Sequence, residues 1–305
     1  MDVRRLDLLR ELADRGSVTA VARATHRTPS AVSQQLKALE REVGVPLTER
    51  SGRGLVLTGP GRVLADTAKD LAAAIQRAES VWAEFLEQPR GEVTLVTFPT
   101  AGEMLLPGVL HRIDAVPGLT LACRDLDPLL PDFADLTPDF DIVIADAPGI
   151  APSWRERGLT VVELLREPLD IVLPEGHPLA AKRSLSPADV VDETWIGVPE
   201  DFPYDRILDR IQAITGHEAR IAQRFIDNSI VEAVIAAGHG IGILPRYTTR
   251  DRENGLVTRP LSGVRSERVI WAILRSDRAE RPSVRLVLDA LQAEAADFAA
   301  KHRPA

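Results

Sequence analysis

Residues 16–57 show the clearest pattern of apolar and polar positions in the chain. Apolar residues recur at i, i+4, i+7 and i+11 between residues 29 and 43, a spacing that places them on one buried face of a helix: Val32, Leu36, Leu39 and Val43. Ser17 and Thr28 stand at N-cap positions, and Pro29 is a favoured first helical residue. The pattern predicts helices at 18–24 and 29–43.

The opposite face of the second predicted helix is polar and then basic. It carries Ser30, Ser33, Gln34, Lys37 and Arg41. Residues 51–54 then turn between two short extended segments, with Arg50 and Arg53 beside the turn. A helix that enters a DNA major groove needs small polar residues at the base edges and cations near the phosphates. A solvated helix face is the alternative, but the capped helices and the Arg-flanked hairpin together favour DNA binding.

The segments TPSAVSQQLKALEREVGVPLTER and LVLTGPG resemble the winged helix-turn-helix of LysR-type transcriptional regulators, and the likeness runs through the whole chain. It implies that Pro29, Ser33 and Gln34 are recognition-helix positions and that Arg53 contacts phosphate from the wing. Thr28 departs from the glutamine usual there. The predicted DNA-binding residues are Thr28, Pro29, Ser30, Ser33, Gln34, Lys37, Arg50 and Arg53.

A long helix is predicted for residues 60–88, about 43 Å at 1.5 Å per residue. Its apolar residues follow the heptad spacing of a paired helix: Leu64, Ala68, Leu71, Ile75, Ala78, Trp82 and Phe85. The alternative is that the helix lies on its own domain. The resemblance implies an antiparallel pair in a homodimer, through Leu64, Leu71, Ile75, Trp82 and Phe85, and a dimer of dimers.

Short β-branched segments alternate with helical ones after Gly91, which predicts an α/β domain with a parallel, doubly wound sheet. Strands are expected at 93–98, 119–124, 141–145, 169–173, 195–198, 224–226, 242–244 and 269–274. Helices are expected at 103–116, at 229–237 and from 282. Three prolines predict that any helix within 125–140 is short.

The resemblance implies the domain organisation: a winged helix-turn-helix, a linker helix and an effector domain with two subdomains, similar to a periplasmic binding protein. The expected boundaries are 1–58 for the DNA-binding domain, 59–89 for the linker helix and 90–305 for the effector domain. Subdomain I comprises 90–161 and 265–305, and subdomain II comprises 162–264.

A ligand site is expected where strands end and helices begin, because helix N-termini present free N–H groups there. Phe98 to Gly102 and Asp227 to Ile230 are two such junctions. The expected effector-binding residues are Thr100, Ala101, Phe202, Asn228, Ser229 and Gly240. Plain helix capping is the alternative for Thr100 and Ser229.

The chemistry of the effector stays open between two classes. Two helix N-termini favour an anion such as a carboxylate. Asp125, Asp127 and Asp146 follow strands on the same side and favour an amino group, unless they only cap local turns. An amphoteric metabolite such as an amino acid satisfies both features, and a simple aromatic or aliphatic acid is the alternative.

Charge and composition agree with a DNA-binding head on an acidic body. The net charge of the 305-residue chain is −8, whereas residues 1–58 carry ten Lys and Arg against seven Asp and Glu. The single cysteine, Cys123, excludes an internal disulfide and a zinc finger and is expected to be a small buried side chain.

The sequence contains no Ser-His-Asp order, Walker loop or His/Cys metal-ligand spacing. The segment from Pro174 to Pro178, which contains His177, resembles a structural turn of the family. We therefore expect a cytoplasmic transcriptional regulator that is not an enzyme, spans no membrane and needs no cofactor or metal besides a small-molecule effector. Double-stranded DNA is the expected partner, and RNA polymerase is a further candidate. The alternative function is an architectural DNA-binding protein without an effector.

Overall fold

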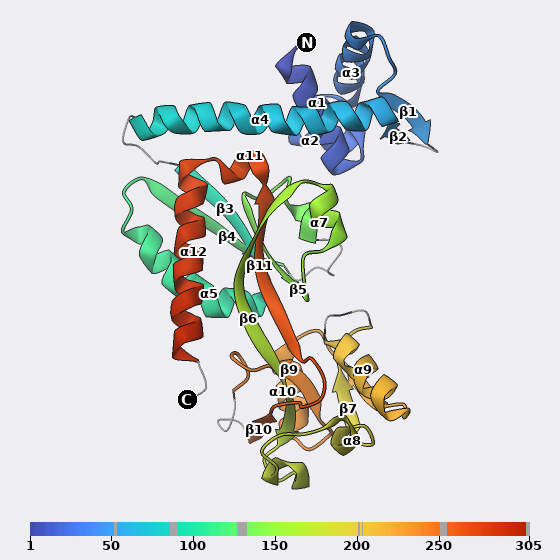
Figure 1. Cartoon of the computed structure of the whole chain (residues 1–305), viewed down its shortest axis with the longest axis vertical. Helices are drawn as coiled ribbons and strands as arrows, with labels where there is room; N and C mark the ends of the chain where they lie inside the picture. Colours follow the sequence, from blue (N-terminus) through green and yellow to red (C-terminus); the bar gives the residue numbers. More distant parts are fainter. Residues whose placement is uncertain are drawn as a thin grey trace.

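The first 57 residues, here called the head, lie at one end of the molecule (Figure 1). The computed structural model describes residues 1–51, 54–85, 91–126, 133–200, 202, 204–250 and 255–302. Three helices of the head pack around one apolar core: α1 (Val3–Arg15), α2 (Val18–Ala24) and α3 (Pro29–Val43). The predicted stripe of α3 is buried there, with Val32, Leu36 and Leu39 inside the core.

The boundaries of these helices follow from their caps. The Ser17 hydroxyl accepts a hydrogen bond from the Ala20 amide at 3.4 Å, and the Thr28 hydroxyl accepts one from the Ala31 amide at 3.2 Å. Gly44 ends α3 with a φ of 79°, a left-handed conformation that glycine adopts with little strain. The predicted helix-turn-helix is therefore confirmed.

The predicted wing is also present, as β1 (Thr48–Ser51) paired antiparallel with β2 (Gly54–Leu57). One Glu40 carboxylate oxygen accepts hydrogen bonds at 2.9 Å from the Leu47 amide, the Thr48 amide and Thr48 Oγ1. The carboxylate thus ties the wing to α3. Residues 52 and 53 lie outside the described residues, and with them the predicted contact Arg53.

The predicted long helix is α4 (Gly59–Phe85), with 27 residues. Its apolar stripe divides into two halves. Ala68 is buried in the core of the chain's own head, and Leu64 and Leu71 pack against that core. Ile75 and Trp82 are 38% and 63% exposed. The helix therefore lies on its own domain only along the first half of its stripe. The side chain of Phe85 lies outside the described residues.

The rest of the chain, from residue 91 to 302, is called the body. Its strands are β3 (Gly91–Thr97), β4 (Leu119–Asp125), β5 (Ile142–Ala147), β6 (Leu159–Pro174), β7 (Thr194–Gly197), β8 (Arg220–Arg224), β9 (Gly242–Pro245), β10 (Leu256–Arg259) and β11 (Glu267–Arg275). Its helices are α5 (Pro99–Asp114), α6 (Phe133–Leu136), α7 (Pro152–Glu156), the 3-10 turn η2 (Pro178–Ala181), α8 (Pro187–Val190), α9 (Asp205–Thr215), α10 (Asn228–Ala236), α11 (Ser276–Ala279) and α12 (Pro282–Lys301).

One large sheet runs through the body, with the strand order β10, β6, β11, β5, β3, β4 and with β9 also paired to β6. The prediction of parallel pairing is confirmed for β3 with β4 and with β5. It is wrong for β6 and β11, which pair antiparallel with each other. The reason is topological: the chain enters the second lobe along one of these strands and returns along the other.

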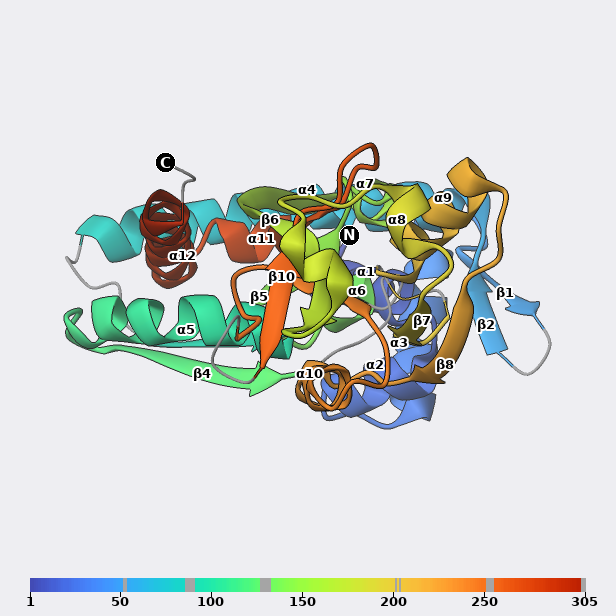
Figure 2. The ribbon, with the colours of Figure 1, turned by 90° about the horizontal axis from the view of Figure 1, so that it is seen from below.

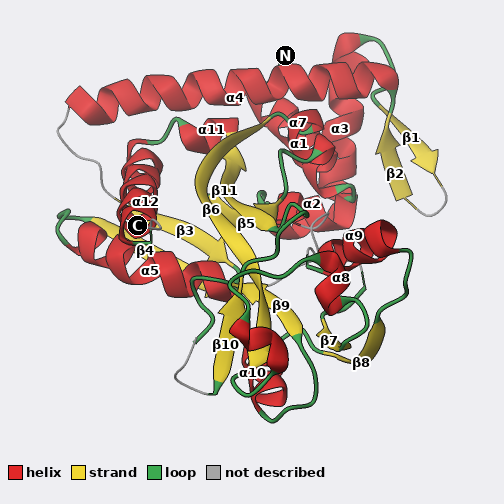
Figure 3. Ribbon diagram, turned by 60° about the horizontal axis from the view of Figure 1, so that its bottom comes forward, coloured by secondary structure: helices red, strands yellow, loops and turns green. Residues whose placement is uncertain are grey.

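The strands β6 and β11 run side by side and join the two lobes (Figure 3). The sequence predicted only residues 169–173 as a strand and a crossing near Val161. In the structure β6 continues unbroken for 16 residues and changes partners at Pro168, from β11 to β9 and β10. The return lies close to the predicted residue 264, since β11 begins at Glu267.

The second lobe has its own apolar core and a separate parallel pair, β7 with β8 (Figure 2). The strand predicted at 224–226 is displaced to Arg220–Arg224, because that segment pairs with β7.

In the first lobe, the described residues of the segment 125–140 include the four-residue helix α6, and residues 127–132 lie outside the described part. Among the described helices, none has both the length and the apolar character needed to cross a membrane.

Candidate nucleic-acid interface and effector cavity

The polar face of α3 is open to solvent, as a DNA-reading helix requires. Pro29, Ser30, Gln34 and Lys37 are exposed, and so is Arg50 on β1. Gln34 and Lys37 also line one shallow hollow of the head.

Two predicted contacts are less available. Ser33 is half-buried. The Thr28 hydroxyl is used as the cap of α3 and lies 3.0 Å from Ser30 Oγ. A threonine therefore serves here as the helix cap. Arg27, counted in the sequence only for its charge, is exposed beside Thr28 in the turn that precedes α3.

A cavity of about 340 Å³ lies between the two lobes of the body. It is lined by side chains from both lobes and from the crossing strand β11: Phe98, Pro99, Thr100, Glu103, Phe133, Asp146, Phe202, Tyr204, Ile226, Asp227, Asn228, Ser229 and Arg268. Four of the predicted effector residues, Thr100, Phe202, Asn228 and Ser229, are among them. The cavity therefore lies at the two predicted strand-to-helix junctions.

Two other predicted residues do not line this cavity. Ala101 is fully buried in the core of the first lobe. Gly240 has a φ of 152°, and a Cβ there would lie 2.4 Å from the Thr194 carbonyl oxygen. Its role is close packing against β7. Asp125 is exposed at the end of β4, and Asp127 lies outside the described residues.

The centre of the cavity wall is Arg268, which sequence reasoning missed. Its guanidinium is buried and donates hydrogen bonds to Glu167 Oε2 from Nε at 2.8 Å, to Tyr204 Oη from Nη1 at 2.7 Å and to Thr100 Oγ1 from Nη2 at 2.8 Å. Asp146 Oδ2 lies 3.4 Å from Nη1. This one side chain joins both lobes and β6.

The charge of Arg268 is matched within the protein. Although burial opposes ionisation, Tyr204, Glu167 and Asp146 together raise the pKa of the guanidinium. The guanidinium also lies over the ring of Phe98, 5.1 Å from its centroid. Because Glu167 is fully buried, its carboxylate depends on Arg268 for compensation.

The two helix N-termini at the cavity differ. Phe98 provides no side-chain cap for α5. The start of α10 is instead capped by Asp227, whose carboxylate accepts hydrogen bonds from the Ser229 amide at 2.8 Å and from Ser229 Oγ at 2.6 Å. These hydrogen bonds lower the pKa of Asp227. The positive end of α10 is thus already neutralised, and only α5 offers a helix end to an anion.

Acidic side chains surround the cavity. Glu103 and Asp227 lie at its rim, and a neighbouring hollow adds Glu232 beside Arg250. Burial raises the pKa of Glu232, Arg250 opposes this rise, and the negative charge of Glu103 adds to it. Among the described residues lining the cavity, three carboxylates accompany one arginine.

Family models and known structures agree with this architecture. Residues 3–62 match the model of the bacterial regulatory helix-turn-helix protein, lysR family, and residues 86–296 match that of the LysR substrate binding domain. The chain is 23% identical to the RuBisCO operon transcriptional regulator of Allochromatium vinosum over 97% of each protein. Its fold is similar to that of a full-length OxyR variant from Pseudomonas aeruginosa (TM-score 0.61, 18% identity, 96% of this chain and 98% of that one).

A second solved structure, full-length CbnR complexed with its target DNA, has a TM-score of 0.53 and 20% identity, with 97% of this chain and 100% of that chain covered. The two family models together span the head, the first turn of α4 and nearly all of the body. The chain therefore belongs to the LysR family: it is a DNA-binding transcriptional regulator whose two-lobed body binds a small-molecule effector.

Proposed function

We propose that this regulator binds its operator as a dimer, through the exposed face of α3 and the wing, and responds to an amphoteric metabolite that carries an amino group. Two observations together support the effector class: carboxylates of the protein already neutralise the charge of Arg268, and the rim of the cavity is acidic. Because the protein acts on DNA, we also infer a cytoplasmic protein. No metal or cofactor is needed besides the effector.

The ligand class follows from electrostatics. A carboxylate ligand gains little from Arg268, since Glu167 and Asp146 already neutralise its charge. An ammonium group near Glu103 would be attracted by its carboxylate, and the attraction is stronger where the cavity excludes part of the water. The uncapped N-terminus of α5 offers a place for a carboxylate on the same ligand. An amino acid or a related compound combines both groups.

Calorimetry against a panel of amino acids, amines and simple carboxylic acids tests this assignment. The ligand that binds is expected to lose about tenfold or more in affinity in Glu103→Gln and in Thr100→Val, because each removes one polar contact. Thr120→Val, an exposed threonine on β4, is the matched control and should bind like the wild type. Tight binding of an acid without an amino group, undiminished in Glu103→Gln, would contradict the proposal.

Dimerisation is proposed for the second half of α4. Ala73 and Ser80 are buried on the face of α4 turned toward α11, where Ser80 donates a hydrogen bond to the Glu280 carbonyl. Ile75 and Trp82 each lie two positions beyond Ala73 and Ser80. Two positions are slightly more than half a helical turn, so these two side chains fall on the opposite face of α4. Both are large apolar side chains exposed in the single chain. A second α4, packed antiparallel, would cover them, and pairs of such dimers would give a tetramer.

Base reading by α3 makes a distinct prediction. Gln34→Ala should cost about 1–3 kcal/mol of binding free energy on the operator and little on random DNA. Lys37→Ala should weaken binding to both and reduce the salt dependence by about one unit, because it removes a phosphate contact. Titrations at several salt concentrations, on an operator located by genome-wide footprinting, measure both effects.

The control for charge alone is Arg112→Ala, which changes a cation on the body, far from α3 along the chain. Equal losses for Gln34→Ala on the operator and on random DNA would show that Gln34 does not read bases.

A further inference from the structure

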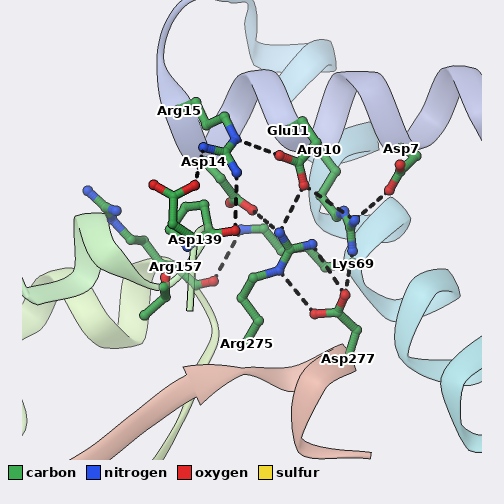
Figure 4. Close-up of polar contacts among 12 residues, drawn as sticks. Asp7, Arg10, Glu11, Asp14, Arg15, Lys69, Asp139, Arg157, Arg275 and Asp277 are labelled. Atoms are coloured by element: carbon green, nitrogen blue, oxygen red, sulfur yellow. Dashed lines mark hydrogen bonds and ion pairs between the residues drawn. The ribbon is translucent and has the colours of Figure 1, made fainter. Parts of the chain in front are cut away.

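Charged side chains of the head form ion pairs with the body of its own chain (Figure 4). Buried apolar residues of the head and of the first lobe form two separate clusters. Between them, α1 and the first turn after β11 are joined by ion pairs. The charged residues of this contact, here called the latch, are Arg10, Glu11, Asp14, Arg15, Asp139, Arg275 and Asp277.

Arg275, at the end of β11, is the centre of the latch. Its Nη1 lies 2.9 Å from Glu11 Oε1 and 3.6 Å from Asp14 Oδ2, both on α1. Its Nε lies 3.1 Å from Asp277 Oδ1. Asp277 in turn accepts a hydrogen bond at 2.8 Å from Arg10 Nη1. The side chains of Arg275, Arg10 and Glu11 are each no more than 10% exposed.

Two peripheral contacts flank this centre. Arg15 Nη1 lies 2.8 Å from Asp139 Oδ1, and the Asp139 side chain is 60% exposed. Lys69 of α4 donates a hydrogen bond at 3.2 Å to the carbonyl oxygen of Arg157, just before β6. The latch therefore holds α1 against the end of β11, and Lys69 holds α4 beside the start of β6.

An ionic contact of this kind can open without exposing an apolar core. The cost of removing the charges from water is offset by their mutual attraction, so the net stabilisation is small while the geometry stays specific. When the contact opens, water can solvate every one of these groups. An apolar contact of equal area would lose its burial energy instead. The chemistry of the latch thus suits a two-state element.

The latch and the effector cavity occupy opposite ends of the same pair of strands. On β11, Arg268 lines the cavity and Arg275 belongs to the latch. On β6, Glu167 holds Arg268, while Leu159 pairs with Arg275 in the sheet. A shift of Arg268 relative to Glu167 would move the far ends of β6 and β11, because paired strands slide or tilt together.

We propose that the latch holds the head at one angle to the body. Effector binding then changes, through β6 and β11, the fraction of molecules in which the latch is closed. This would alter the spacing of the two heads of a dimer on DNA. The coupling step rests on the proposed function, whereas the latch itself does not. It is therefore tested without any effector.

The mild variant is Asp139→Lys, which places a positive charge opposite Arg15 at an exposed position. Its matched control is Asp297→Lys: that side chain is 59% exposed and pairs with Arg112, but both residues lie within the body. The strong variant is Arg10→Gln combined with Asp277→Asn, which leaves the net charge of the latch unchanged. Thermal unfolding verifies that each protein is folded.

Small-angle X-ray scattering and DNase footprints of the full-length protein give the readouts. We expect the radius of gyration to rise by about a tenth in both latch variants, because a released head moves away from the compact body. The footprint should shift by about one helical turn of DNA. The control should match the wild type in both measurements.

Wild-type scattering and footprints in Asp139→Lys and in the double variant would overturn the latch. So would equal changes in Asp297→Lys. If the double variant fails to fold, Asp139→Lys decides alone. If no compound of the effector panel binds but the latch variants still alter the footprint, the latch stands. Only the proposed ligand class and the coupling step are then contradicted.

Discussion

Replacement of Arg268 by methionine is expected to destabilise the body by about 3–5 kcal/mol, because it leaves the carboxylate of Glu167 buried without its cation. Glu167 is fully buried and receives hydrogen bonds from Nε and Nη2 of Arg268. Its Oε1 also accepts the Tyr247 amide at 2.9 Å, which does not supply a charge. Urea unfolding followed by tryptophan fluorescence measures the change, because Trp154, Trp195 and Trp271 all report on the body.

Two further variants separate the charge effect from simple truncation. Arg166→Met removes an arginine of β6 that is 49% exposed and pairs with Glu163, and it should cost at most about 1 kcal/mol. Arg268→Met combined with Glu167→Gln should recover part of the loss, since no uncompensated charge then remains. A double variant no more stable than Arg268→Met would show that lost packing, rather than the buried charge, causes the effect.

Ile75→Asp is expected to convert the protein into a monomer and to lower operator affinity by roughly 10²–10⁴, the range that a second linked head contributes. Ile75 is 38% exposed in the single chain, so aspartate there should barely change folding. In a paired helix the same carboxylate would be buried against apolar side chains. Analytical ultracentrifugation gives the oligomeric state, and titrations on operator and half-site DNA give the affinities.

Val63→Asp is the matched control for this substitution. Val63 is an apolar α4 residue that is 69% exposed but lies off the heptad stripe. It should remain dimeric and bind the operator normally. A dimeric Ile75→Asp, or a monomeric Val63→Asp, would place the dimer contact elsewhere.

The features that the sequence predicted well are local ones. Ser17, Thr28 and Gly44 act on the helix that each one caps, within four residues. The α3 stripe depends only on helical periodicity, so the buried positions could be read directly. The same holds for the ends of β3 and α10, which located Thr100 and Ser229 at one cavity. Such signals need no knowledge of distant parts of the chain.

The unpredicted features depend on contacts between distant residues. Arg268 and Thr100 are 168 positions apart, and Arg275 and Glu11 are 264 apart. Nothing near Arg268 in the sequence distinguishes it from a surface arginine at the start of a strand. Only residues 169–173 of the long strand β6 were predicted, because polar residues such as Arg166 and Glu167 break the apolar pattern before them, although the fold buries Glu167.

The sequence alone thus determined α2, α3 and α4, the wing, the heptad stripe and the two strand-to-helix junctions at the cavity, because short-range periodicity and capping decide them. Tertiary structure decided which charges meet. It neutralised Arg268 with Glu167 and Asp146 and placed Arg275 against α1. Burial then gives each of these pairs its energetic weight, and burial is a property of the assembled chain rather than of any segment.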